Sequence, residues 1–393
     1  MQRRDVLRLG GALAAGALVG SSLWRTMLGD EALAAETVRG AALPAHGPYG
    51  PLLDPDENGI LLPAGFRSRI LARANQPVRG TDYAWHIFPD GAATFPARGG
   101  GWIYTSNSEA TGPVGVSAIA FNASGAVVDA YSILTGTIIN CDGGATPWGT
   151  WLSCEEWDGG HVWECDPSGA TPGIKRAALG TFKHEAVAAD PRRRVLYLTE
   201  DQGDGRFYRF RPTRWEDLSE GALDVAAVAA DGAVTWLPVP APNDVATPTR
   251  RQVPESTPFR GGEGIVYRRW HVYFTTKGDN RVWDYNTLDE TIRVLYEASA
   301  DPLRILTGVD NLAVTPGGDL MVAEDGGNME LVLISPRGVA TPFLRIVGQD
   351  GSELAGPAFS PNGKRLYVSS QRGDGLGITY EVTGPYQRPW PRP

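Results

Sequence analysis

The sequence predicts an all-β fold, a six-bladed β-propeller with four-stranded blades. The first observation is composition: the 393 residues include 49 Gly, 30 Pro and 12 Trp but only 4 Met, which favours many turns and short strands over helices. The second is a strand–turn–strand unit that recurs roughly every 46–48 residues, the spacing of propeller blades. The third is that six such units align, which a two-sheet sandwich would reproduce only by chance.

Each unit opens with a turn that leads into an apolar strand. The turns are 95–99, 146–149, 190–193, 268–270, 315–318 and 360–363. A Gly-led strand of alternating pattern follows in each unit, and most units then add a fourth strand. The sixth unit runs out of chain before its fourth strand. The early strand 67–71 can supply it and close the ring.

Residues 1–35 are expected to be a twin-arginine signal peptide outside the fold. Arg3 and Arg4 precede the apolar, Gly- and Ala-rich run 9–19, and 32–34 offers small residues for cleavage. That run is too short and too rich in Gly to suit the alternative, an N-terminal membrane anchor. Residues 36–60 are expected to form an extended lead-in. Residues 61–393 should form one propeller with a Pro- and Ala-rich insertion at about 212–257.

The net charge and the cysteines narrow the range of functions. A formal charge of -9 argues against nucleic-acid binding, whereas clustered acids would suit cations. Three cysteines in an exported protein leave at least one unpaired or acting as a ligand. In the hairpin around 157–160, Cys154 would face position 163 and not Cys165, so a disulfide is not favoured. Both are expected to be buried small hydrophobes.

One side-chain position recurs in every unit, six residues before the turn proline or its equivalent. Four of its occupants are carboxylates and one is a thiol: Asp90, Cys141, Glu185, Glu263, Asp310 and Ala355. The innermost strand of each blade starts at one mouth of the central channel, so these positions should form a ring. The second strands return to the same mouth. They end in Asn107, Glu109, Glu155, Glu156, Glu200, Asp201, Asp279, Glu324 and Asp325.

A ring of carboxylates repels itself strongly unless cations neutralise it. Carboxylate oxygens suit calcium, and a thiolate beside them suits a transition metal such as iron. The alternative is that the acids only decorate turns and that Cys141 is a structural thiol. Ligand-type side chains in the same register of five of the six units favour a metal site at the mouth.

Other polar side chains near these motifs allow two interpretations each. His184 is expected to pack or to support a ligand, and not to bind a metal. Lys183, Arg206, Arg260 and Lys277 could contact an anionic substrate, although each alone is more often a salt-bridge partner. The chain has no Gly-x-Ser-x-Gly elbow, Walker loop, dinucleotide fingerprint or Cys-x-x-Cys pair, and five His argue against a histidine-rich zinc site.

Several motifs resemble those of the PhoX-type alkaline phosphatase family, over roughly residues 60–375. They are 140–144, Thr-Pro-Trp-Gly-Thr-Trp at 146–151, Cys-Glu-Glu at 154–156, Lys-His-Glu at 183–185, Gly-Glu-Gly at 262–264 and 275–281. The resemblance implies a six-bladed propeller, twin-arginine export and an iron–calcium cluster that hydrolyses phosphate esters. By motif, iron would be held by Cys141, Glu185 and Glu263. Calcium would be held by Glu109, Glu156 and Asp310.

Asn107, Lys183 and Arg260 are expected to complete the site as catalytic residues. The two cations would stabilise the negative charge that spreads in phosphoryl transfer. Two positions depart from the family pattern. Ser108 stands where family members tend to have histidine, and two glycines separate Arg260 from Glu263 where an arginine closer to the glutamate is expected.

The sequence therefore predicts an exported, metal-dependent phosphoric ester hydrolase, specifically a phosphomonoesterase, with iron and calcium as cofactors. Its expected partners are a small phosphate ester and the twin-arginine export machinery, with no nucleic acid and no stable membrane anchor in the mature form. We expect a monomer in the periplasm or outside the cell. The alternatives are a calcium-dependent propeller esterase or lactonase, and a noncatalytic binding propeller stabilised by metals.

Overall fold

The computed structural model describes residues 47–386, so the predicted signal peptide lies outside the described residues. Across this range no helix has the length and apolarity needed to cross a membrane. The regular elements are strands and a few short 3-10 turns, which confirms the predicted all-β class.

Six antiparallel sheets make up the fold. Blade one holds β3 (Pro89–Pro96), β4 (Trp102–Ser108), β5 (Val114–Phe121) and β6 (Val127–Thr137), and blade two holds β7 (Asn140–Ala145), β8 (Trp151–Glu155), β9 (Val162–Cys165) and β10 (Ile174–Lys175). Blade three holds β11 (His184–Asp190), β12 (Val195–Glu200), β13 (Phe207–Arg214), β14 (Asp217–Val228) and β15 (Val234–Pro238), and blade four holds β16 (Gly262–Arg268), β17 (His271–Thr276), β18 (Arg281–Asn286) and β19 (Thr291–Glu297). Blade five holds β20 (Val309–Val314), β21 (Leu320–Glu324), β22 (Glu330–Ile334), β23 (Ala340–Ile346) and β1 (Ile60–Leu61), and blade six holds β24 (Leu354–Phe359), β25 (Arg365–Ser370), β26 (Ile378–Thr383) and β2 (Arg67–Arg73).

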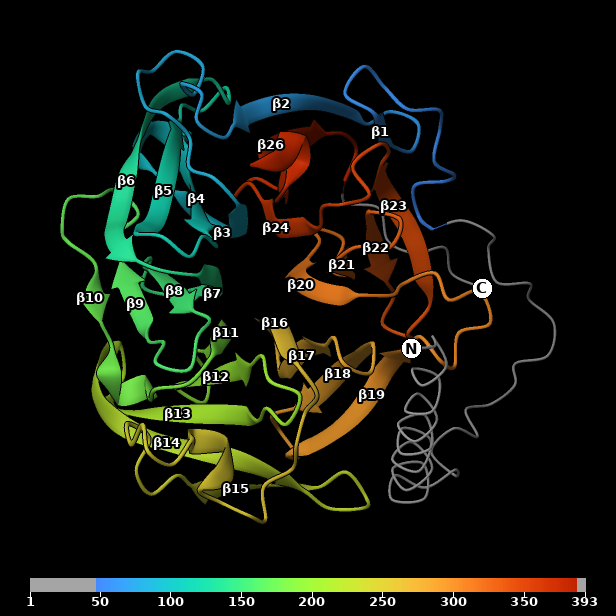
Figure 1. Ribbon diagram of the computed structural model, residues 1–393. Coiled ribbons are helices and arrows are strands. Elements are labelled where there is room, and N and C mark those ends of the chain that lie inside the picture. Colours follow the sequence, from blue (N-terminus) through green and yellow to red (C-terminus); the bar gives the residue numbers. More distant parts are fainter. Residues whose placement is uncertain (1–46, 387–393) are drawn as a thin grey trace, which may run out of the picture.

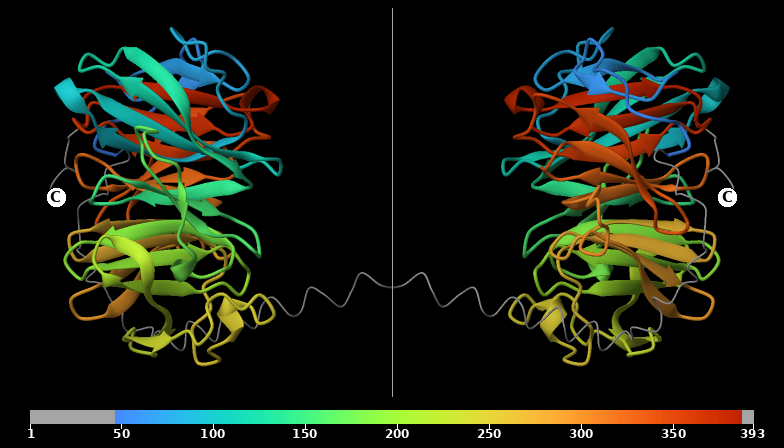
Figure 2. Two further views of the ribbon diagram at one scale, coloured as in Figure 1. Left: turned by 90° about the vertical axis from the view of Figure 1, so that its left-hand side faces the viewer. Right: turned by 90° about the vertical axis from the view of Figure 1, so that its right-hand side faces the viewer.

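The six blades surround a central axis, with the first strand of each blade innermost (Figure 1). Each innermost strand lies against those of the two neighbouring blades, and β24 meets β3 to close the ring. The side views show the sheets layered face to face in a thick disc (Figure 2). The ring closes as the sequence predicts, because β2 pairs with β26 and supplies the fourth strand of blade six.

Two segments differ from the expected layout. The stretch 212–257, expected as an insertion, contains β14 and β15, which extend blade three to five strands. The expected lead-in ends in β1, which pairs with β23 as a fifth strand of blade five. The first five residues of β14, Asp217–Gly221, include four that are polar or glycine and do not show the apolar pattern of a strand, so the sequence alone suggested an insertion.

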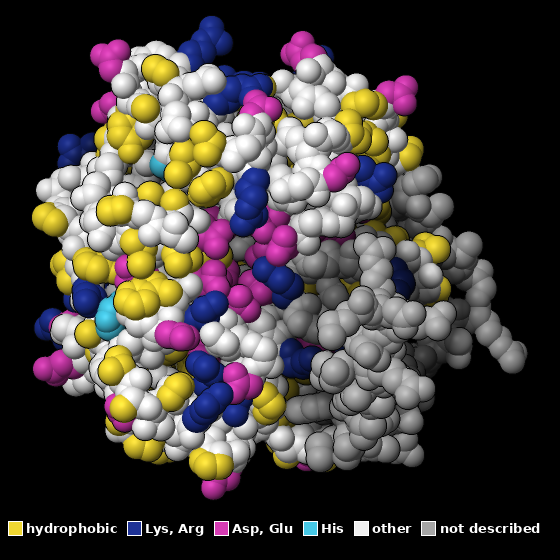
Figure 3. Space-filling model, viewed as in Figure 1, with side chains coloured by type: hydrophobic (Ala, Val, Ile, Leu, Met, Phe, Trp, Pro, Cys, Tyr) yellow, Lys and Arg dark blue, Asp and Glu magenta, His cyan; other side chains and the backbone are white. Residues whose placement is uncertain are grey.

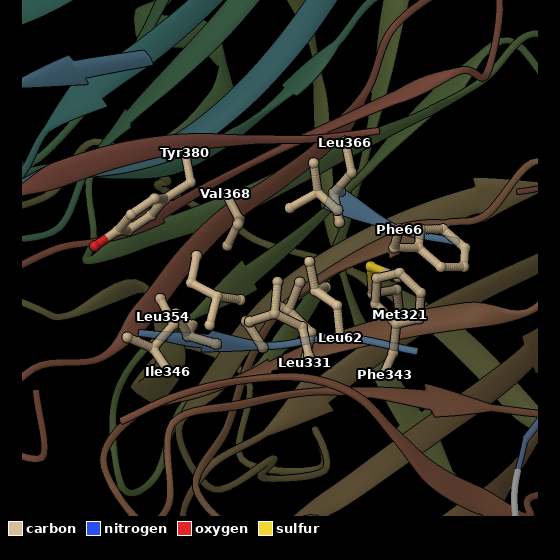
Figure 4. Close-up of a cluster of buried hydrophobic side chains, with 14 of the residues drawn as sticks. Leu62, Phe66, Met321, Leu331, Phe343, Ile346, Leu354, Leu366, Val368 and Tyr380 are labelled. Carbon is tan, nitrogen blue, oxygen red and sulfur yellow. The ribbon is translucent and has the colours of Figure 1, made fainter. Parts of the chain in front are cut away.

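The hydrophobic core lies between neighbouring sheets. One cluster joins blades five and six, where Met321, Leu331 and Ile346 meet Leu354 and Tyr380 (Figure 4). Burying each such side chain stabilises the fold by about 1.5–3 kcal/mol. This packing holds neighbouring blades in a fixed relative position. The side chains at the mouth of the channel come from all six blades, so their distances from one another depend on this packing.

The three cysteines are buried and unpaired, as expected. Cys154 lies opposite Val162 and Cys165 opposite Trp151, one residue away from the register expected for the hairpin. No disulfide can therefore join them without moving the strands.

Candidate metal centre

In five blades the ladder between the first and second strands slips by one residue at the ligand-type position. Two residues of the inner strand face one residue of its partner there, which is a β-bulge. The first residue of each bulge is an acid or a thiol, and we call these five the bulge ring: Asp90, Cys141, Glu185, Glu263 and Asp310. A bulge turns a side chain out of the alternating pattern of a strand, so all five can aim at the channel.

The second residue of each bulge is small or polar because neighbouring inner strands approach closely. A Cβ on Gly91 would lie 2.3 Å from the Asp142 carboxylate, and one on Gly264 would lie 2.7 Å from the Asn311 Cα. Larger side chains at these glycines would push the blades apart. The tight approach keeps the carboxylates of the bulge ring within a few ångströms of one another.

In three of these blades, the residue opposite the bulge donates a hydrogen bond to the bulge of the next blade. The Thr199 hydroxyl donates to the Glu263 carbonyl at 2.6 Å, and the Thr275 hydroxyl donates to the Asp310 carbonyl at 2.6 Å. Asn107 has the same position in blade one. Its amide nitrogen donates to the carbonyls of Cys141 at 3.0 Å and of the following residue at 2.8 Å.

This arrangement assigns Asn107 a different role from the expected catalytic one. Its side chain is fully buried, and its amide oxygen accepts hydrogen bonds from Trp151 at 2.9 Å and from Ser153 at 3.0 Å. All of its polar atoms are thus engaged inside blades one and two. Asn107 positions the Cys141 segment and does not face the opening.

The acid pairs at the ends of the second strands divide into two sets. The first acid of each pair bonds within its own blade: Glu155 accepts from the Trp163 indole at 3.0 Å, and Glu200 accepts from the Tyr208 hydroxyl at 2.7 Å. Glu324 accepts from backbone amides, 3.0 Å from that of Thr307. The second acids, Glu156, Asp201 and Asp325, lie beside the bulge ring, as does Glu109, which follows Ser108 at the corresponding place in blade one.

Among residues 47–386, four groups of side chains bring ligand atoms within 4.8 Å of one another; their members are acids and the Cys141 thiol. The groups are Glu109–Cys141–Glu156, Asp90–Glu109–Glu353, Glu185–Glu263–Asp310 and Asp310–Asp325–Glu353. All six residues that the sequence proposed as metal ligands belong to these groups. The groups share Glu109, Asp310 and Glu353, so the four form one continuous donor cluster.

The donor atoms suit a cluster of cations. Asp90 Oδ1 and Glu185 Oε2 are buried and have no hydrogen-bond partner, which is costly for a carboxylate unless a cation or proton is near. The Cys141 sulfur lies 3.3 Å from Glu185 Oε1 and 3.8 Å from Asp90 Oδ2. Hard oxygens with one thiol fit calcium together with a transition metal.

The pKa values of these groups indicate that ionising the cluster is unfavourable unless positive charge lies nearby. Burial, followed by repulsion from neighbouring acids, raises the pKa of Glu185 and Asp90 well above the ordinary range. Burial likewise raises the pKa of Glu156 to about 7 and that of Asp310 to about 6. Burial and the Asp90 carboxylate raise the pKa of the Cys141 thiol. Bound cations would reverse these shifts and favour the ionised forms.

Basic side chains lie among and around these acids. The Lys277 ammonium lies 3.4 Å from Glu263, 3.5 Å from Asp310 and 3.1 Å from Asp325. Lys183 pairs with Glu156 at 3.1 Å. On this face of the molecule, Asp and Glu side chains gather at the centre with Lys and Arg side chains beside them (Figure 3).

The remaining expected site residues lie farther from the donor cluster or inside the fold. Arg260 is exposed, and its carbonyl accepts a hydrogen bond from the Gly278 amide at 2.9 Å. The Arg206 guanidinium donates to Ser256 at 2.7 Å and so belongs to blade three. His184 is buried against Phe182, with ring centroids 3.6 Å apart, which agrees with the packing role expected for it.

Sequence reasoning missed what blade six contributes. Its bulge position holds Gly356 and Pro357, and the ligand atoms come instead from Glu353, just before β24 begins. Gln371 donates to Asp90 at 2.5 Å and to Glu109 at 2.7 Å. The only signal for Glu353 is its place two residues before the aligned Ala355, which the repeat alone does not single out.

Comparisons with known proteins agree with this architecture. The model of the alkaline phosphatase PhoX family matches residues 103–160, 157–302 and 289–374. A search of curated proteins finds no match.

Two solved structures are similar to this chain. Pseudomonas fluorescens PhoX in complex with vanadate, a transition state analogue, is 17% identical with a TM-score of 0.69, and the alignment covers 86% of this chain and 97% of that one. The pyranose dehydrogenase PQQ domain from Coprinopsis cinerea is 13% identical with a TM-score of 0.51, covering 84% of this chain and 98% of that one. At these identities the likeness shows a shared propeller fold.

Proposed function

Because the chain belongs to the alkaline phosphatase PhoX family, we propose that it is an exported, metal-dependent hydrolase of phosphate monoesters. The observation that carries the proposal is the donor cluster at the mouth. It joins the bulge ring of five blades to Glu353 of the sixth through ligand atoms within 4.8 Å in each group. Acidic side chains that were merely exposed in turns would have no reason to converge at the mouth of the channel.

The proposed cofactors are iron and calcium. Iron would lie with Cys141, Glu185 and Glu263, because the thiol is the one soft donor of the cluster. Calcium would lie with Glu109, Glu156 and Asp310, which offer oxygen alone. When bound, the metals would supply Lewis-acid polarisation of the phosphoryl group and activation of a nucleophile.

The protein's own side chains would position and stabilise the substrate. Lys183 is partly exposed and would lend positive charge to phosphoryl oxygens once Glu156 binds a metal. Arg260, which is exposed, would attract the anionic ester. Asn107 would act indirectly, by holding the Cys141 segment in place. The buried bulge ring would exclude bulk water from the reacting phosphorus and strengthen these charges.

We further propose that the chain follows the twin-arginine route, acts in the periplasm or outside the cell, and works as a monomer without nucleic acid or a membrane anchor. Export in the folded state would let the metals be inserted before the protein leaves the cytoplasm.

The test uses protein purified after maturation through its own export route. Its metal content is measured, and then turnover of p-nitrophenyl phosphate is followed before and after treatment with a chelator. We expect iron and calcium in the protein and turnover that the chelator abolishes. Bis-p-nitrophenyl phosphate, assayed in parallel, tests the preference for monoesters.

Two results would contradict the proposal. Absence of phosphatase turnover under every iron and calcium loading would refute it. Calcium without iron, together with turnover of a lactone, would favour a propeller esterase or lactonase instead.

A further inference from the structure

Blade six places one arginine at the rim of the donor cluster. Arg372 follows β25 and precedes the short 3-10 turn Gly373–Gly375. Its guanidinium lies 2.5 Å from Glu353 Oε1 and 3.9 Å from Glu109 Oε2. Both carboxylates belong to the Asp90–Glu109–Glu353 group of the donor cluster, and Glu109 is one of the proposed calcium ligands.

The backbone of Arg372 is fixed while its side chain stays accessible. Its amide donates to the Ser352 hydroxyl at 2.8 Å, and the preceding residue, Gln371, is clamped between Asp90 and Glu109. The side chain is 45% exposed, compared with 35% for Lys277 and 29% for Lys183. Of the three cations that contact the donor groups among the described residues, Arg372 is thus the one that solvent and substrate reach most easily.

A bound metal would compete with Arg372 for the same carboxylates. A cation bound by Glu353 and Glu109 would neutralise them and weaken their attraction for the guanidinium. Lys277 differs because its nearest partner is Asp325, at 3.1 Å, which is not among the proposed metal ligands. Metal loading would therefore free Arg372 to face the opening, while Lys277 would keep its contact with Asp325.

We propose that Arg372 binds the phosphoryl oxygens of the substrate and so determines the affinity of the site for phosphate. This inference rests on the proposed function. A guanidinium has a planar fork of N–H donors that matches two phosphoryl oxygens, which an ammonium cannot do. It would also offset the repulsion that an anionic ester meets at a mouth rich in carboxylates.

The experiment compares metal-loaded wild-type protein with Arg372→Ala and Arg372→Lys. Arg345→Ala is the control, because Arg345 is similarly exposed (38%) and pairs with a buried glutamate at 2.5 Å, but on the outer part of blade five. Metal content, binding of inorganic phosphate by calorimetry, and the KM and kcat for p-nitrophenyl phosphate are measured for each. We expect Arg372→Ala to weaken phosphate binding and raise KM about tenfold or more, with metal content unchanged. Arg372→Lys should recover part of the loss, and Arg345→Ala should match wild type.

The outcomes separate this inference from the proposed function. Wild-type phosphate affinity in Arg372→Ala at full metal content would overturn the assignment. Loss of metal in both Arg372 variants would also overturn it, because the arginine would then serve to hold Glu353. If wild-type protein hydrolysed no ester yet bound phosphate through Arg372, the proposed function would fail while the arginine assignment stood.

Discussion

Substitution of Glu156 by glutamine should change the stability of the protein in opposite directions with and without metals. The Glu156 side chain is only 12% exposed. Burial, followed by repulsion from Asp201, raises its pKa from 4.5 to about 7, even though Lys183 favours the ionised form. In protein treated with a chelator, the ionised carboxylate therefore costs folding free energy at neutral and alkaline pH.

The size of the effect follows from that pKa. The unfolded state ionises first, near pH 4.5, so the folded protein loses stability as the pH rises through the window from about 4.5 to about 7. The loss levels off above this window at about 3 kcal/mol. Glutamine resembles the protonated acid. In the chelated protein, Glu156→Gln should thus equal wild type near pH 4 and exceed it by up to about 3 kcal/mol at pH 8.

The assay is urea unfolding in the presence of chelator at pH 4 and at pH 8, with Glu220→Gln as the control. Glu220 is exposed on β14, so its substitution should leave stability unchanged at both values. Comparison of variant with wild type at each pH cancels the contribution of the buried histidines, which both proteins share. In metal-loaded protein the sign should reverse, because glutamine is a poorer ligand. A chelated Glu156→Gln protein that is less stable than wild type at pH 8 would refute the reasoning.

Three further predictions concern single side chains of the mouth. Cys141→Ser should lower the iron content of the exported protein and leave calcium bound, because the proposed thiol ligand is lost. The control Cys154→Ser, whose thiol is buried in the core of blade two, should keep both metals. Elemental analysis measures both metals, and iron that survived in Cys141→Ser would count against a thiol ligand. Thr199→Val should lower the free energy of unfolding by about 1–3 kcal/mol, because the buried Glu263 carbonyl loses its hydrogen-bond donor. Urea unfolding measures this change, and an unchanged midpoint would contradict the positioning role of Thr199. Lys277→Met should lower the melting temperature of the chelated protein more at pH 8 than at pH 4, because three carboxylates that are ionised at pH 8 lose their neighbouring cation. Equal losses at the two pH values would argue against this role of Lys277.

The sequence was informative about the repeat and the ligand positions because both depend on local spacing. Turn residues recur at blade intervals, and the position six residues before them selects Cys141 and the four acids of the bulge ring correctly. The pairing of β2 with β26 also follows from simple counting, since blade six lacks a fourth strand. These features need no knowledge of which way a side chain turns.

The details that spacing could not predict depend on three-dimensional packing. Glu155 and Glu156 are adjacent and chemically alike, yet one bonds to an indole inside the blade and the other reaches the mouth. Asn107 was expected to meet substrate, but it lies opposite a bulge and bonds to the next blade. Glu353 lies outside the aligned position, immediately before β24, and the bulge of blade six falls one residue later than in the other blades, which the repeat does not show.

Because of the bulges, the identity of the ligand-type side chain in a blade does not affect how the strands of that blade pair. In five blades, the first bulge residue lies at a gap in the ladder, outside the alternating pattern of the strand, and exchanging its side chain would alter the donor set. Blade six does not offer this freedom: Gly356 has a φ of 59°, and a Cβ there would lie 2.4 Å from the Asp90 carbonyl oxygen. The scaffold therefore provides five positions where the ligand-type side chain can vary and one fixed seam. A single substitution in the bulge ring would change the donor set of one blade while the strands of that blade stay paired.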